Sequence, residues 1–213
     1  MSDVIIVAGG ASILEGVETG LWDKIRDKEI WSLNFAFKAM PYSPNRELWV
    51  DTTFWKNNIA ELEALHKIGV ACHCRKNDRY NGIPDIIQHA TSREPNNTNN
   101  LYIGGMGLCG MFALSLAVRE QRNPIYLLGY DWGTNRLGDT QTHFYQGMSG
   151  VSYQSSGVGR REVYIQDNNN PKRDVNDFNV YGGYKEIYNV SMRSHINTFP
   201  KLSYEEFYGR IKT

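Results

Sequence analysis

Short, continuously apolar runs recur along the chain, and each ends in glycine or a polar side chain. The run DVIIVAGGAS (3–12) is rich in β-branched residues and ends in glycines and a serine. EIWSLNFAF (29–37) and ELWVDTTFW (47–55) follow the same plan, with Asn34 and Asp51 where the strands should end. Runs without apolar–polar alternation are typical of strands buried on both faces of a parallel sheet. We therefore expect a strand at the start of each segment.

Helical patterns separate these runs. We expect helices near residues 17–27, over 58–68 with apolar residues on one stripe, and over 107–121. The last of these leads into the strand PIYLLGYD (124–131). GVACHC (69–74) and YKEIYNVS (184–191) complete the predicted strands. A final helix, SYEEFYGRI (203–211), opens at Ser203, with Glu206 three residues later as in a capping box.

Strands that alternate with helices predict an α/β fold, a mostly parallel sheet with helices on both faces. At 213 residues the chain has the length of one sizeable domain, so we expect a single Rossmann-like domain over 1–213. Residues 91–100 read as a polar loop. Residues 133–180 lack periodicity and are rich in Gly, Ser, Asn and Tyr, which predicts a lid or an irregular insertion.

Composition excludes some classes of protein. The 23 Lys and Arg balance the 23 Asp and Glu, so no global charge favours nucleic acid or an anionic membrane. No apolar run approaches the ~20 residues of a membrane span, and the start resembles no signal peptide, so we expect a cytoplasmic protein. The cysteines of ACHCRK, Cys72 and Cys74, are interpreted as reduced thiols on opposite faces of a strand, and we expect no metal.

Polar and glycine residues at the strand ends form the candidate site. The carboxyl ends of parallel strands share one edge of the sheet, where ligands bind in this class of fold. Glycines at a strand-to-helix turn let the backbone approach a phosphate. The residues concerned are Gly9, Gly10, Ser12, Asn34, Asp51 and Asp131.

A second glycine cluster keeps another interpretation open. Gly105, Gly107 and Gly110 spell G-x-G-x-x-G, and Asp131 lies near the spacing of a ribose-binding acid, as in an NAD-dependent dehydrogenase. Against this, the preceding NNLYIGG is a weak strand, and little chain follows Asp131. The chain has neither a P-loop motif nor an Asp-x-Asp motif.

His143 differs from the other four histidines because it follows the Asp131 strand end within a glycine-rich loop. An imidazole there is suited to act as a general base near neutral pH. The remaining histidines fall in predicted helix, strand or turn positions and are interpreted as structural or solvated.

An ordered set of segments carries a family resemblance: VIIVAGGASI, IWSLNFAF, LWVDTTFW, GLCGMFALSLAVREQRNPIYLLGYDWG and THFYQG. Together they resemble the small bacterial sialyltransferases that use a CMP-sugar. They also resemble a broader set that includes motility-accessory glycosyltransferases and archaeal 6-hydroxymethylpterin pyrophosphokinases. The similarity covers residues 3 to about 147, and IYNVSMRSHINTF loosely matches the family's final strand.

The resemblance implies roles for particular positions. It places nucleotide contacts at Gly9, Gly10, Ser12 and Asn34, and the catalytic histidine at His143. Asp51 stands where the family has Asn. Leu108, Cys109 and Gly110 replace a Thr-Ser-Gly, so only the glycine is kept, while Gly129 and Asp131 match a Gly-x-Asp. The departures concern the nucleotide side of the site.

We therefore expect an inverting glycosyltransferase that uses a CMP- or UDP-sugar donor, with no obligatory cofactor. Its acceptor is a glycan, or a hydroxymethylated base in phage DNA, which the neutral net charge disfavours. Three alternatives remain: a pterin-type diphosphotransferase that needs ATP and Mg²⁺, a non-catalytic nucleotide-binding module, and the dehydrogenase.

Overall fold

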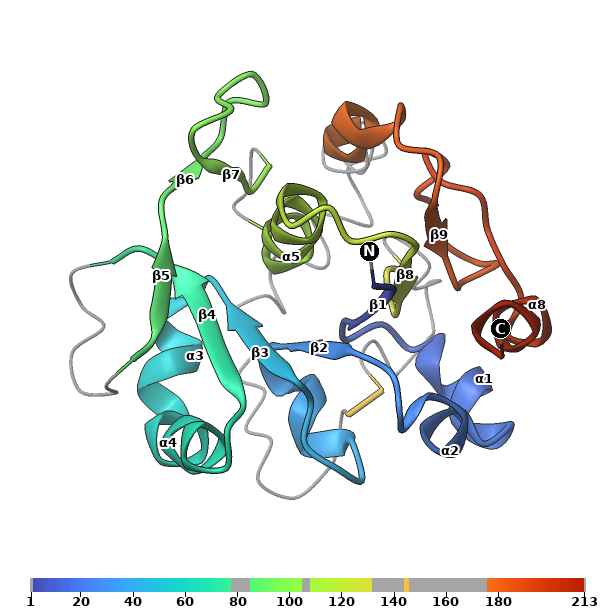
Figure 1. The fold of residues 1–213 in the computed structure, drawn as a ribbon, viewed down its shortest axis with the longest axis horizontal. Helices are drawn as coiled ribbons and strands as arrows, with labels where there is room; N and C mark the ends of the chain where they lie inside the picture. The colour runs from blue at the N-terminus through green and yellow to red at the C-terminus, as the bar shows by residue number, and fades with distance from the viewer. Residues whose placement is uncertain (1, 78–84, 105–107, 132–143, 146–175, 213) are drawn as a thin grey trace, which may run out of the picture.

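The computed structural model describes residues 2–77, 85–104, 108–131, 144–145 and 176–212. Within these residues a seven-stranded sheet has the order β5-β4-β3-β2-β1-β8-β9, and every neighbouring pair is parallel (Figure 1). The strands are β1 (Val4–Val7), β2 (Ile30–Leu33), β3 (Arg46–Trp49), β4 (Ala71–Arg75), β5 (Ile87–His89), β8 (Ile125–Leu128) and β9 (Ile187–Asn189).

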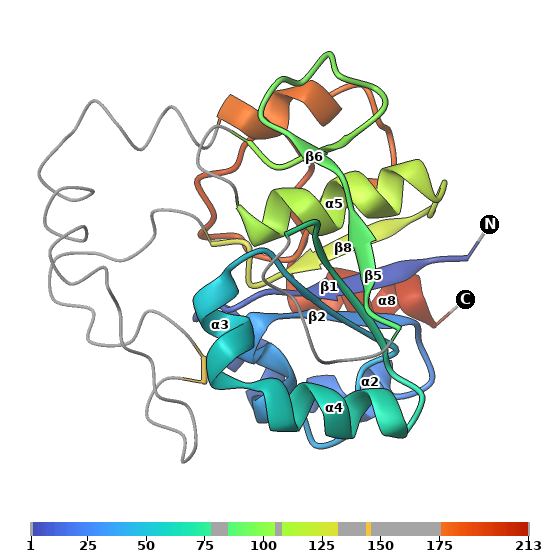
Figure 2. The ribbon, with the colours of Figure 1, turned by 90° about the vertical axis from the view of Figure 1, so that its left-hand side faces the viewer.

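Helices cover both faces of the sheet, which confirms the predicted Rossmann-like α/β architecture. On one face lie α5 (Cys109–Arg119) and the short 3₁₀ helix η2 (Asp177–Tyr181). The other face carries α1 (Ile13–Glu18), α2 (Leu21–Ile25), α3 (Thr52–Asn57), α4 (Ile59–Lys67) and α8 (Tyr204–Ile211) (Figure 2). The 3₁₀ helix η1 (Asn34–Ala39) follows β2 directly.

Burial explains why the apolar runs lack alternation. All four residues of β1, β2 and β8 are buried, because helices pack against both faces of these central strands. Phe112 and Leu114 of α5 are fully buried in one core cluster, and Phe207 of α8 is fully buried in the cluster on the opposite face. The three core clusters therefore lie on the two faces of one sheet.

Several predicted boundaries shift. The helix expected at 17–27 is two short helices, because Gly20 adopts a left-handed backbone with φ 79° between them. Residues 91–100 are not only loop, since β6 (Thr91–Ser92) pairs with β7 (Leu101–Tyr102) in a second, two-stranded sheet. The segment 133–180 was predicted to be irregular, but its last residues form the 3₁₀ helix η2. The capping box that opens α8 is confirmed.

The thiols of Cys72 and Cys74 share a face of β4, so the expectation of opposite faces was wrong. Residues two apart in a strand point the same way. Both thiols pack in the cluster beneath α3 and α4, and burial raises the pKa of each to about 12. They are therefore neutral.

No helix in the described part of the chain is long and apolar enough to cross a bilayer.

Candidate functional site

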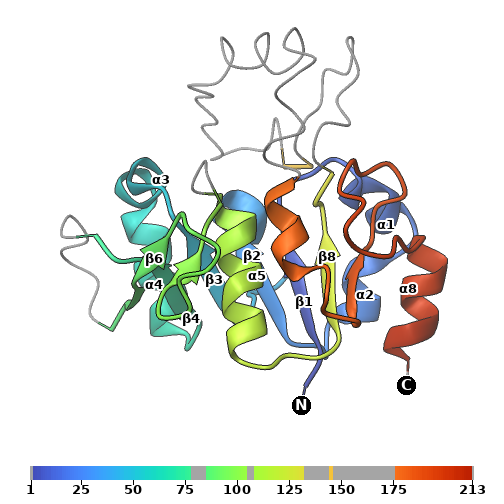
Figure 3. The same cartoon turned by 90° about the horizontal axis from the view of Figure 1, so that it is seen from above.

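The carboxyl ends of β1, β2, β3 and β8 lie along one edge of the sheet, as predicted. Gly9, Asn34, Asp51 and Asp131 each come within three residues of a strand end. The chain also reverses its direction of travel across the sheet here, because β2 and β8 flank β1 on opposite sides. In Figure 3 the N-terminus marks the opposite end of the sheet, where β1 begins. Ligands of open α/β sheets bind at such a switch point, outside the carboxyl ends of the strands.

The glycine turn after β1 packs backbone against backbone on the turn after β8. The Gly10 amide donates to the carbonyl of Gly129 over 3.0 Å, and Gly129 has φ 71°. A Cβ on Gly10 would lie 2.4 Å from the Gly129 carbonyl oxygen. The glycine at position 10 is therefore required by packing, whatever the turn binds.

Both carboxylate oxygens of Asp131 are hydrogen-bonded to Ser12. The Ser12 amide donates to Asp131 Oδ2 over 2.8 Å, and the Ser12 hydroxyl donates to Asp131 Oδ1. Both residues are buried. The pair ties the start of α1 to the end of β8, so these two predicted nucleotide contacts bind each other in this structure.

Two amides of the glycine turn have no partner in the part of the chain that the structure describes. The amides of Gly10 and Ser12 are engaged, whereas those of Gly9 and Ala11 have no hydrogen-bond partner among the described residues. Backbone amides at such a turn favour an anion.

Asn34 combines a strained backbone with an unsatisfied side chain. It follows β2 directly and has φ 54°, in the left-handed region that Asn tolerates better than most residues. Its amide oxygen Oδ1 is buried and accepts no hydrogen bond within the described residues. Buried polar atoms are nearly always paired, so an unpaired one at a sheet edge points to a missing ligand or water.

Asp51 begins α3. Its side chain is exposed, and Oδ1 accepts from the Thr53 amide over 2.7 Å as an N-cap. One carboxylate oxygen thus has a structural partner, and the other remains for a ligand hydroxyl.

The start of α5 offers no polar side chain. Leu108 is the N-cap and makes no side-chain hydrogen bond. Burial raises the pKa of the Cys109 thiol well above its usual range. Cys109 is therefore a neutral thiol, and its Sγ donates to the Leu48 carbonyl over 3.4 Å. Gly110 accommodates the ring of Tyr130, whose hydroxyl donates to the Gly110 carbonyl over 3.0 Å.

His143, Gly105 and Gly107 lie outside the described residues. Phe144, which follows His143 in the sequence, is described: its amide nitrogen donates to the Gly9 carbonyl over 3.0 Å. Phe144 and Tyr145 are buried, and their rings contact Trp22 and Phe35 respectively. The chain therefore passes the glycine turn immediately after position 143.

The sequence analysis missed the segment after β9. The Ser194 hydroxyl donates to the Tyr130 carbonyl over 2.6 Å, and the His195 amide donates to the Asp131 carbonyl over 3.2 Å. The signal was available, because the polar run SMRSH follows an apolar strand just as the other site residues do.

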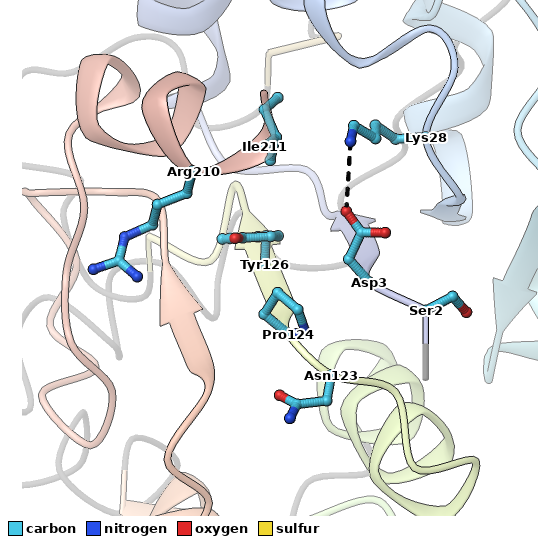
Figure 4. Close-up of a pocket in the computed structure, with 8 residues that line it drawn as sticks. All are labelled: Ser2, Asp3, Lys28, Asn123, Pro124, Tyr126, Arg210 and Ile211. Atoms are coloured by element: carbon cyan, nitrogen blue, oxygen red, sulfur yellow. Dashed lines mark ion pairs between the residues drawn. The ribbon is translucent and has the colours of Figure 1, made fainter. Parts of the chain in front are cut away.

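A surface cavity of about 300 Å³ lies at the opposite end of the sheet, between the starts of β1 and β8 and the end of α8 (Figure 4). The ammonium group of Lys28 forms an ion pair with Asp3, another lining residue, over 3.8 Å. This cavity is not the predicted site. The described residues also contain no cluster of three or more His, Cys, Asp or Glu side chains that could hold a metal ion.

Comparison with known proteins gives no assignment: no family model, no curated protein and no solved structure matches the chain.

Proposed function

We propose that the protein is an inverting glycosyltransferase that uses a nucleotide-sugar donor. The observation that carries the proposal is Asn34, whose buried amide oxygen has no partner among the described residues, at the same edge as the amides of Gly9 and Ala11, which also lack one there. An amide oxygen accepts hydrogen bonds from a base or a ribose, and backbone amides donate to phosphate oxygens. A nucleotide supplies both kinds of group.

The donor would extend along this edge from β3 to β8. Asn34 and Asp51 would contact the nucleoside, and the turn at Gly9 and Ala11 would contact the phosphate. A CMP- or UDP-sugar fits this order of groups, and the resemblance described above favours the CMP-sugar.

His143 would act as the general base. The acceptor oxygen forms a bond to the anomeric carbon while the bond from that carbon to the phosphate oxygen breaks. The electron pair leaves with the nucleotide, and the proton of the acceptor hydroxyl passes to the imidazole. The hydrogen bond from Phe144 to Gly9 supports this role, because Phe144 follows His143 in the sequence and Gly9 belongs to the turn that would bind the donor phosphate. The acceptor would be a glycan or a hydroxymethylated base.

The dehydrogenase alternative gains no support. It needs Asp131 for the ribose, but both oxygens of this carboxylate accept hydrogen bonds from Ser12. It also needs a strand of the main sheet before the glycines. The strand at that place, β7, has only two residues and belongs to the separate two-stranded sheet.

The proposal is tested first by ligand-induced thermal shifts with CMP, UDP, ATP with Mg²⁺, and NAD. Stabilisation by CMP or UDP is expected. Stabilisation by ATP with Mg²⁺ alone would favour a diphosphotransferase, and stabilisation by NAD alone would favour the dehydrogenase.

Asn34→Gly tests the observation on which the proposal rests, because glycine tolerates the positive φ while the side-chain amide and its methylene group are removed. Nucleotide affinity should fall by roughly 10-fold or more, in line with the ~1–3 kcal/mol cost of losing one partner of a buried hydrogen bond. Gln121→Gly is the matched control, since Gln121 also has a positive φ, 57°, but lies at the opposite end of α5 from the site. Equal affinity in both variants and the wild type would refute the placement of the nucleotide.

His143→Ala tests the chemistry. Turnover should fall by roughly 10²–10⁴-fold with donor affinity nearly unchanged, the usual contribution of general acid–base catalysis. Single-turnover assays and melting curves on the same variant separate this result from a loop-anchoring role. A folded, donor-binding variant with near-native turnover would exclude His143 as the base, and a wild type that binds nucleotide without transfer would support a non-catalytic module.

A further inference from the structure

The segment after β9 crosses the site edge and is fixed to the end of β8. The hydrogen bonds from Ser194 to the Tyr130 carbonyl and from the His195 amide to the Asp131 carbonyl hold its backbone in place. Ser194 and Ile196 are buried, whereas Arg193 and His195 are exposed. Two basic side chains therefore face outward from a rigidly held backbone.

Arg193 is directed toward the helix that begins at the glycine turn. Its Nε lies 3.0 Å from Oε1 of Glu15, which is three residues after Ser12 in α1. The contact is an ion pair without hydrogen-bond geometry, since Glu15 Oε1 accepts no hydrogen bond. Within the described residues Arg193 has no other polar partner, and its side chain is 74% exposed. Both terminal nitrogens of the guanidinium are thus available.

The carboxylates near the glycine turn favour a cation in a phosphate site there. Asp131 contacts the turn at the Ser12 amide, Glu15 lies three residues further along and pairs with Arg193, and the turn itself offers only amide dipoles. A phosphate bound there would meet net repulsion unless a cation offset it, and a leaving nucleotide gains negative charge as its bond to the sugar breaks. An arginine guanidinium binds phosphate oxygens with two parallel hydrogen bonds.

We propose that Arg193, with His195 beside it, binds the phosphate oxygens of the nucleotide donor. This inference rests on the proposed function, because it assigns the cation that the donor phosphate needs.

The test is calorimetric titration of the wild type, Arg193→Gln, Arg193→Lys and Arg26→Gln with cytidine, CMP, uridine, UDP and inorganic pyrophosphate. Arg26 is the matched control, an exposed arginine at the end of α2 that pairs with Asp23. In the wild type each nucleotide should bind more tightly than its nucleoside. Arg193→Gln should lose ~10-fold or more of the affinity for CMP, UDP and pyrophosphate and keep that for the nucleosides. Arg193→Lys should recover part of the loss, and Arg26→Gln should match the wild type.

The outcomes separate the two proposals. If nucleotides bind and Arg193→Gln retains the full preference over nucleosides, the role of Arg193 is wrong and the proposed function stands. If only pyrophosphate binds, and Arg193→Gln abolishes its binding, the anion site stands without a nucleotide donor. If the wild type binds none of the five compounds, both proposals fail.

Discussion

The stacked histidine pair on β4 and β5 should make the protein less stable as the pH falls below neutrality. His73 is 4% exposed, and its Nδ1 lies 3.0 Å from Nε2 of His89. Burial, together with the positive charge of Arg46 and the neighbouring His89, lowers the pKa of His73 from 6.5 to about 4. The structure thus favours the neutral ring.

The sign and size of the effect follow from linkage. A histidine with a depressed folded-state pKa contributes stability that is fully present above pH 6.5 and is lost as the pH falls toward 4. The shift of about 2.5 pH units corresponds to ~3 kcal/mol, because each unit is worth ~1.4 kcal/mol.

The perturbation is His73→Asn, which retains a polar atom near the position of Nδ1 but does not titrate. Urea unfolding of both proteins at intervals from pH 8 to pH 4 gives two curves of unfolding free energy. Carboxylates titrate in both proteins, so the difference between the curves isolates His73. The wild type should lose ~3 kcal/mol more than the variant over this range. Parallel curves would refute the assignment of a neutral, buried ring.

Two further predictions concern the core and the glycine turn. Glu47 is fully buried, accepts a hydrogen bond from Ser32, and has its pKa raised well above the usual range by desolvation. Its folded state holds a proton that the unfolded chain releases, so stability falls as the pH rises above the unfolded pKa. Glu47→Gln should therefore be more stable than the wild type at pH 8 and gain less at pH 5, measured by urea unfolding. An equal difference at both pH values would contradict this. Gly10→Ala should cost roughly 1–3 kcal/mol, because the new Cβ would overlap the Gly129 carbonyl. Gly183→Ala, whose Cβ meets nothing within 4 Å, should leave the free energy of unfolding within ~0.5 kcal/mol of the wild type. Urea unfolding measures both glycine variants.

Several parts of the site could be predicted because they depend on local pattern and on one topological rule. Apolar runs ending at Asn34 and Asp51 predicted strand ends, and parallel strands must bring their carboxyl ends to one edge. The partners of these side chains could not be predicted. The Ser12 to Asp131 pair joins residues 119 positions apart, and nothing in either local sequence indicates that each is the other's partner.

The position of the segment after β9 could not be predicted from its local sequence either. Arg193 and His195 lie in a polar run that follows an apolar strand, and this local pattern does not distinguish a site segment from a solvated turn. Their relevance to the site comes from hydrogen bonds to the end of β8, some 64 residues earlier in the chain.

By itself the sequence determined the fold class, six of the seven strands of the main sheet, and the edge of the sheet at which the predicted site residues lie. Hydrophobic periodicity and turn residues act over a few positions, so they fix local structure and the burial of each face. The tertiary structure decided which polar groups satisfy one another and which have no hydrogen-bond partner among the described residues. Asp131 and Ser12 belong to the first group, and Asn34 Oδ1 belongs to the second. That division depends on which distant strands are neighbours, because a hydrogen bond forms only where packing brings its donor and acceptor within ~3 Å.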